Sequence, residues 1–189
     1  MLNQTNTMKT ETWIGNIISK NTENKNIKIF FSIITVFLGS LLLIASAKIK
    51  VPLYPVPMTL QPMAVLMIAM LFGRKLATLT VGLYIFKGVI GLPVFAFGGG
   101  LMYLMGPTGG FILGFFVSAL IVGHLADRGW GKKVSLSIIS MLIGMLVIYS
   151  LGIFQLALLK GFNFALLKGF YPFLSVSYTH LTLPTTSSV

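Results

Sequence analysis

The sequence contains no cysteine and only three acidic side chains among its 189 residues. Without cysteine, the chain has no disulfide, no thiolate metal site and no cysteine nucleophile. The acidic residues, Glu11, Glu23 and Asp127, all lie outside the long apolar runs. An intramembrane enzyme would need acids, histidines or a Ser/Lys pair within its spans. Because the spans hold no Asp or Glu, that class is the weaker alternative, and we expect no catalytic residues.

The sequence also lacks motifs for ATP hydrolysis and metal binding. No G-x-x-x-x-G-K-[ST] loop is present, so the chain cannot hydrolyse ATP by that route. It has two histidines, His124 and His180, which are far apart in the chain. A metal site needs several ligands at suitable spacing. We therefore expect neither a metal site nor a cofactor.

Apolar residues dominate what is present. The chain is 56% hydrophobic and 9% charged, with a mean hydropathy of +0.92, whereas soluble proteins carry about 25% charged residues. This composition predicts an integral membrane protein, and the length suits one compact helical bundle. The net charge of +11 comes from lysines and arginines at the ends of apolar runs. Such placement is typical of membrane topology rather than of nucleic-acid binding.

Five apolar runs predict an all-α bundle of about five transmembrane helices: 29–47, 58–72, 76–97, 111–126 and 134–159. A turn at Gly73-Arg74-Lys75 separates the second run from the third. The second run would cover only about 22 Å at ~1.5 Å per residue. A bilayer core is about 30 Å thick. The preceding loop must therefore dip inward to complete that crossing.

Basic residues predict the orientation. With the N-terminus inside, nine lysines and arginines fall on the cytoplasmic side, four fall outside and Lys87 lies within a span. The excess of positive charge inside predicts a multi-pass protein of the plasma membrane with a cytoplasmic N-terminus. The domain organisation that follows is a polar cytoplasmic tail at 1–28, a transmembrane domain at 29–174 and an aberrant polar tail at 175–189.

Two loops interrupt the apolar runs. The proline loop, residues 48–62, has four prolines, and the glycine loop, residues 91–110, has seven glycines and two prolines. Such backbone is tolerated at membrane depth only when it is buried in protein or lines a cavity. In transport proteins, interrupted segments of this kind indicate the binding site. Both loops fall on the predicted outer face, where together they would close a small-molecule pocket.

Three motifs in these loops carry a family resemblance: VPLYPVPMTLQ at 51–61, GLPVF at 91–95 and GPTGGFILGF at 106–115. In this order and spacing, over roughly 45–174, the chain resembles BioY, the biotin-binding S subunit of energy-coupling factor transporters. The resemblance implies a six-helix protein that captures biotin from outside. It also implies two kinds of partner, a coupling transmembrane subunit and a pair of ATPases.

The resemblance stops near the C-terminus. The segment YPFL at 171–174 matches the start of a family motif that continues into Gly-Asp and a lysine, and in the family those charged side chains contact the ligand. Neither follows Leu174 here, so we expect the last helix to be missing or incomplete. A non-functional truncated membrane protein and a binder of another small vitamin are therefore alternatives.

Four side chains are candidate ligand contacts. Thr59 and Gln61 would hydrogen-bond the ureido ring of biotin, or else cap the helix that follows. Tyr84 would supply an aromatic wall with a polar tip, or else pack within the bundle. Lys87 carries a charge that costs about 2.5–3.5 kcal/mol at mid-membrane. It would either snorkel to the interface or pair with the biotin carboxylate in place of the missing family lysine.

The glycine loop supplies the other candidates. The three-glycine run would let a ligand approach the backbone closely, or would form a simple turn. The segment 107–110 begins a helix whose N–H groups would suit the valerate carboxylate, unless its threonine only caps that helix. These candidates are Gly98, Gly99, Gly100, Pro107, Thr108, Gly109 and Gly110.

Small residues on the first span are candidates for a partner contact. The resemblance implies that a small-residue face of this helix meets the coupling subunit, and small residues allow close helix approach. The candidates are Gly39, Ser40, Ala45, Ser46 and Ala47.

Overall fold

The computed structural model of the protein describes residue 12 and residues 25–169. Most of the predicted N-terminal tail, the segment 171–174, the predicted tail 175–189 and His180 lie outside the described residues. The described elements are α2 (Lys25–Lys48), β1 (Lys50–Val51), β2 (Met58–Thr59), α3 (Gln61–Val89), α4 (Leu101–Met105), α5 (Gly109–Asp127), η1 (Trp130–Lys132), α6 (Val134–Lys160) and α7 (Phe162–Gly169).

Helices make up nearly all of this fold. The strands of the described residues are one short antiparallel pair, in which Lys50 faces Thr59 and Val51 faces Met58. Four helices, α2, α3, α5 and α6, are long and apolar enough to cross a membrane. The prediction of an all-α membrane protein is confirmed.

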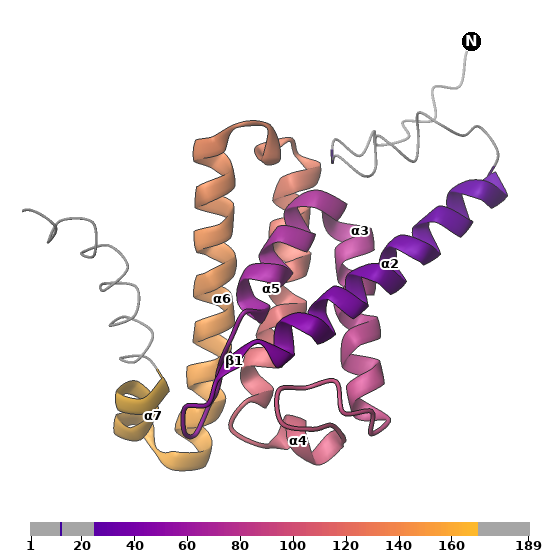
Figure 1. Ribbon diagram of the computed structural model, residues 1–189. Helices are drawn as coiled ribbons and strands as arrows, with labels where there is room; N and C mark the ends of the chain where they lie inside the picture. The colour runs from indigo at the N-terminus through magenta and orange to yellow at the C-terminus, as the bar shows by residue number, and fades with distance from the viewer. Residues whose placement is uncertain (1–11, 13–24, 170–189) are drawn as a thin grey trace, which may run out of the picture.

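Helix α3 is a hairpin of two arms, 61–72 and 74–89 (Figure 1). Gln61 and Tyr84 are 23 residues apart, yet their side chains share a hydrogen bond of 2.7 Å. In one continuous helix they would lie about 35 Å apart at ~1.5 Å per residue. The chain turns back at Gly73, whose φ of 74° and ψ of 177° are nearly exclusive to glycine. The predicted turn at this glycine is confirmed.

Asp127, at the end of α5, holds the hairpin turn in place. Its Oδ2 accepts a hydrogen bond of 3.2 Å from the backbone N–H of Arg74. That N–H begins the second arm, where a carboxylate also complements the helix dipole. A Cβ on Gly73 would overlap Asp127 Oδ1, so the turn accepts only glycine. Asp127, the acidic residue in the described part of the chain, thus joins α5 to α3.

Some helix ends differ from the prediction. Helix α2 already includes Lys25, four residues before the predicted start, since lysines are good helix formers and no Gly or Pro interrupts them. Helix α3 ends at Val89 rather than at 97, since Gly91 has a φ of 97° and Pro93 follows. It also starts at Gln61 instead of 58, because residues 58–59 pair in the strand.

The small residues of α2 lie inside the bundle. Gly39, Ser40, Ser46 and Ala47 are buried, whereas Ala45 is exposed. A Cβ on Gly39 would lie 2.8 Å from side-chain carbons of Phe72 and Thr80 of α3, so close packing of α2 on α3 uses this face. The predicted partner contact is therefore wrong for the four buried residues.

Candidate ligand-binding site

The proline loop and the glycine loop meet at one end of the bundle (Figure 1). Lys48 Nζ donates hydrogen bonds to Pro93 O at 2.7 Å and to Phe95 O at 2.8 Å. Lys50 Nζ donates to Ala96 O and lies 3.7 Å from the centre of the Phe97 ring. These contacts tie segment 93–97 to the start of the proline loop. The prediction that the two loops come together is confirmed.

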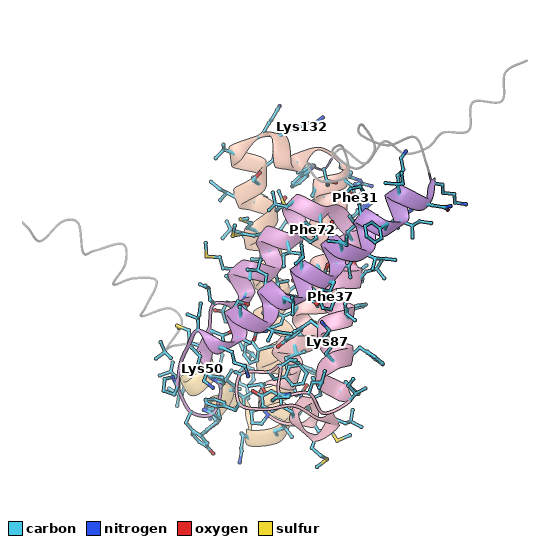
Figure 2. All side chains as sticks on the ribbon, turned by 45° about the vertical axis from the view of Figure 1, so that its right-hand side comes forward. Phe31, Phe37, Lys50, Phe72, Lys87 and Lys132 are labelled. Atoms are coloured by element: carbon cyan, nitrogen blue, oxygen red, sulfur yellow. The ribbon has the colours of Figure 1, made fainter. Side chains whose placement is uncertain are left out.

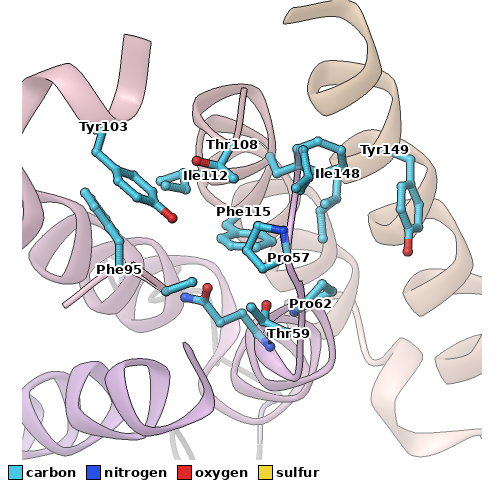
Figure 3. A pocket seen from close by; sticks show the side chains of 14 residues that line it. Pro57, Thr59, Pro62, Phe95, Tyr103, Thr108, Ile112, Phe115, Ile148 and Tyr149 are labelled. Atoms are coloured by element: carbon cyan, nitrogen blue, oxygen red, sulfur yellow. Dashed lines mark hydrogen bonds between the residues drawn. The ribbon is translucent and has the colours of Figure 1, made fainter. Parts of the chain in front are cut away.

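A cavity lies beneath these loops (Figure 3). Its walls are mainly aromatic and aliphatic, with a few polar side chains, as is typical of small-molecule sites. The two loops contribute Val56, Pro57, Thr59, Phe95, Ala96, Tyr103 and Thr108, and the helices contribute Gln61, Pro62, Phe111, Ile112, Phe115, Ile148 and Tyr149.

Gln61 is a buried polar group of the cavity. It is 4% exposed, and its Nε2 donates to Tyr84 Oη at 2.7 Å. Tyr84 in turn packs edge-on against Phe95, with ring centres 5.5 Å apart, and Phe95 stacks on Tyr103 at 5.0 Å. This row of contacts fixes the amide. Its side-chain oxygen, which has no partner among the described residues, is left to accept a hydrogen bond from a ligand.

Two more of the predicted polar contacts line the cavity, whereas Tyr84 lies outside its lining. Thr59 Oγ1 accepts a long hydrogen bond of 3.4 Å from the backbone N–H of Gln61, at the start of α3. Because the hydroxyl oxygen only accepts in this bond, Thr59 can cap the helix and still donate its proton to a ligand. Thr108 precedes α5 without a side-chain cap bond, and it lines the cavity. The capping alternative for Thr108 is therefore wrong.

The cavity is small as it stands. Its volume is about 40 Å³, enough for a few water molecules. Sites for drug-sized ligands measure about 300–1,000 Å³. A vitamin can enter only if the loops or the aromatic walls move apart.

The three-glycine run, 98–100, packs against neighbouring backbone and does not line the cavity. Gly98 O accepts from Phe95 N–H and Gly100 N–H donates to Gly88 O, at 2.9 and 2.7 Å. A Cβ on Gly99 would overlap Leu92 O. These contacts form a tight turn. Ligand contact by Gly98, Gly99 and Gly100 stays a prediction.

The start of α5 is likewise used for packing. Cβ atoms on Gly109 and Gly110 would overlap Leu104 O and Leu151 O. The Gly109 N–H already donates to Gly106 O at 3.1 Å. Pro107 stands beside Thr108 but outside the lining. Anion binding by this helix start stays a prediction.

Lys87 lies between α2 and α3, away from the cavity (Figure 2). Its Nζ donates to Ser40 Oγ at 2.9 Å and stands 4.5 Å from the centre of the Phe37 ring. A cation–π contact and a hydroxyl partner offset the cost of placing this charge among apolar helices. Ligand contact by Lys87 stays a prediction, and its placement gives that prediction no support.

We expect Lys87→Met to leave ligand affinity within about threefold of the parent and to change stability instead. The substitution keeps the side-chain length but removes the bond to Ser40 and the contact with Phe37, each worth about 0.5–1.5 kcal/mol. Calorimetric titration and thermal unfolding of the same sample measure both effects. A tenfold loss of affinity with unchanged unfolding would instead place Lys87 at the ligand.

Sequence reasoning missed several residues of the site. Phe111 and Phe115 lie within the 106–115 motif but were not singled out as candidates, and Tyr149 carried no signal that separates it from lipid-facing aromatics. Gln155 was not among the candidates, but its Nε2 donates to Leu104 O and Gly106 O, at 2.9 and 2.7 Å. It thereby fixes the turn that carries Thr108. The signal that could have found Gln155 is that it is a lone amide side chain in an otherwise apolar helix.

Comparison with known proteins decides the family. A model of the BioY family matches residues 19–185. The chain belongs to the BioY family. The BioY match extends past Leu174, where the motif resemblance stops. The recognition made from the loop motifs is confirmed.

Individual BioY proteins agree with this assignment. The chain is 44% identical over 118 residues to "Biotin transporter BioY" of Thermotoga maritima, covering 61% of this chain and 68% of that protein. It is 39% identical over 129 residues to "Probable biotin transporter BioY" of Pyrococcus horikoshii, covering 68% and 75%. These BioY relatives are named as transporters and not as enzymes, as expected for this chain.

A solved structure has the same fold as this BioY chain. It is the crystal structure of the S-component for biotin from an ECF-type ABC transporter, with a TM-score of 0.64 and 23% identity. The match covers 75% of this chain and 78% of that one.

Proposed function

We propose that this chain is the substrate-capture subunit of a biotin uptake system, which binds biotin from the outer side. The observation that carries the proposal is the cavity beneath the two meeting loops, with Gln61 held in place by Tyr84. Family membership gives the ligand class, and the cavity gives the place where it would bind.

The chemistry of biotin suits the groups that line the cavity. Its ureido ring is flat and carries two N–H donors and one carbonyl. The Gln61 side-chain oxygen accepts from one N–H, and the hydroxyls of Thr59 and Thr108 can donate or accept. The apolar ring edge and the valerate chain are buried against Phe95 and Phe115. Binding uses shape, hydrogen bonds and apolar burial, without a covalent step.

Entry and release require the small cavity to widen. Lys48 and Lys50 hold segment 93–97 through its backbone carbonyls, so loop opening breaks these bonds. The chain has no loop for ATP hydrolysis. We propose that a coupling transmembrane subunit and an ATPase pair supply the energy that reorients the bundle and releases biotin inside.

The arms of α3 give the proposed membrane placement. Each arm crosses separately with its flanking loop, so α2, the two arms, α5 and α6 make five crossings within the described residues. The N-terminal tail is cytoplasmic, the transmembrane domain spans 29–174 in the plasma membrane, and the proline and glycine loops face outward. The excess of basic residues at the opposite end supports this orientation.

Calorimetric titration of biotin into detergent-purified protein tests the function. We expect tight, stoichiometric binding, competed by biotin analogues that keep the ureido ring and not by unrelated vitamins. A second protein, in which residues 175–189 are replaced by a family-type last helix, serves as the comparison. Binding by the completed protein alone would make this chain a non-functional fragment. Absence of binding by both, or preference for another vitamin, would overturn the proposal.

A further inference from the structure

A second hollow of the molecule lies on the lipid-facing side, apart from the ligand cavity. Helix α2 leans away from α3 toward its N-terminal end (Figure 1), and an open groove of about 790 Å³ lies between α2 and the second arm of α3. The two helices close on each other below the groove, where Gly39 meets Phe72 and Thr80.

The groove is apolar along its walls. Ile29 and Ile33 of α2 and Leu79 and Phe86 of α3 line it, and each is at least half exposed. Phe37 lies near the closed end of the groove and is labelled in Figure 2. No water is present at this depth of a bilayer, so such a groove is filled by hydrocarbon chains or by another helix.

The length of the groove matches one leaflet. The lining runs along α2 from Lys25 to Phe37, a rise of about 18 Å at ~1.5 Å per residue. Half of a bilayer core is about 15 Å. An acyl chain of one leaflet therefore fits the groove from its open end to its closed end.

Two lysines stand at the open end. Lys25 and Lys28 line the groove three residues apart, so they share one face of α2. Neither ammonium has a hydrogen-bond or ion-pair partner within the described part of the chain. Arg74 and Lys75 begin the facing arm at the same end of the bundle, and Asp127, the acidic residue described, is engaged by the Arg74 N–H.

We propose that this groove is a binding site for an anionic phospholipid, with one acyl chain between α2 and α3 and the phosphate between Lys25 and Lys28. Basic pockets between transmembrane helices at the cytoplasmic side bind anionic headgroups. The groove supplies both halves of such a site, an apolar slot of leaflet length and a mouth with two lysines that have no partner among the described residues. This inference does not depend on biotin being the ligand of the other cavity.

Native mass spectrometry of the full chain with phosphatidylglycerol and phosphatidylcholine of identical acyl chains tests the site. We expect retention of phosphatidylglycerol, and a loss of about 10- to 30-fold in its affinity for the Lys25→Gln/Lys28→Gln protein, since each lysine near a membrane surface contributes about 1 kcal/mol. Arg128→Gln/Lys133→Gln removes the same charge from exposed positions outside the groove, and should leave the affinity unchanged.

A second variant tests the apolar half without changing charge. Gly82 lines the groove, and Gly82→Leu would fill it, lowering retention of the anionic lipid severalfold. Equal binding of the two lipids, or an equal loss in the Arg128→Gln/Lys133→Gln control, would overturn the proposal. So would a cross-link from a single cysteine at Leu79 to a helix of the coupling subunit in the assembled complex, because that helix would then occupy the groove.

Discussion

Replacing Gly110 by alanine is expected to lower biotin affinity at least tenfold and to lower the thermal unfolding temperature of the purified protein. An added Cβ would overlap Leu151 O, and would stand 2.7 Å from Gln155 Cβ and 3.1 Å from Gly152 Cα. Two of these three neighbours are backbone atoms of α6, which cannot turn aside as a side chain can. The helices α5 and α6 must therefore separate.

The separation affects folding and binding together. Overpacking of this kind costs about 1–3 kcal/mol, and each kcal/mol shifts the unfolding temperature of a protein this size by about 2–4 °C. Helix α5 carries Phe111 and Phe115 and α6 carries Ile148 and Tyr149, so the same movement displaces two walls of the cavity.

Gly82→Ala is the matched control for this substitution. Its added Cβ would lie 3.6 Å from Phe116 Cε2, an ordinary contact, and alanine is the better helix former by about 1 kcal/mol. Equal or higher stability and unchanged biotin affinity are expected for the control. If Gly110→Ala behaved in the same way, close approach of α5 and α6 would not be the role of Gly110.

The sequence predicted the helical runs, the break at Gly73 and the meeting of the two loops, because each depends on local properties. Run length, glycine and proline placement and charge at the ends of runs can all be read along the chain. The loop motifs added the family. Where a helix ends was less certain: the apolar run continues to 97, but the φ of 97° at Gly91 ends α3 well before that.

The direction in which each side chain points was not predictable in the same way. A soluble helix has one apolar stripe that shows which side is buried, whereas a membrane helix is apolar on all sides. Lys87 was therefore assigned to the pocket or the interface, and the sequence did not indicate its hydrogen bond to Ser40. Phe95 and Phe97 stand two residues apart in one loop, yet Phe95 is 0% exposed and Phe97 is 57% exposed.

Gln61→Leu is expected to lower biotin affinity by about tenfold to a hundredfold, since a lost hydrogen bond with an unsatisfied partner costs about 1–3 kcal/mol. Leucine has a similar volume but offers no acceptor to the ureido N–H. It also leaves Tyr84 Oη, on a side chain that is 1% exposed, without its bond to Gln61. Stability should therefore fall along with affinity. Calorimetric titration and thermal unfolding measure the two losses on one sample.

Tyr84→Phe separates the two roles of this pair. It keeps the ring that packs against Phe95 and removes only the hydroxyl that holds the Gln61 amide. We expect a smaller loss of affinity, about threefold to tenfold, because the amide remains at the cavity but is no longer fixed. Stability should change less than in Gln61→Leu, since the Gln61 amide can turn toward the cavity.

The double variant, Gln61→Leu with Tyr84→Phe, distinguishes positioning from direct contact. If Tyr84 acts only by holding Gln61, the double variant binds biotin no more weakly than Gln61→Leu alone, because the interaction it supports is already gone. Its stability should meanwhile recover, since replacing both partners of a buried hydrogen bond by apolar groups is nearly neutral. If stability recovers while biotin binding stays lost, the Gln61 amide contacts the ligand directly. Additive losses of affinity would instead show that the Tyr84 hydroxyl itself contacts biotin.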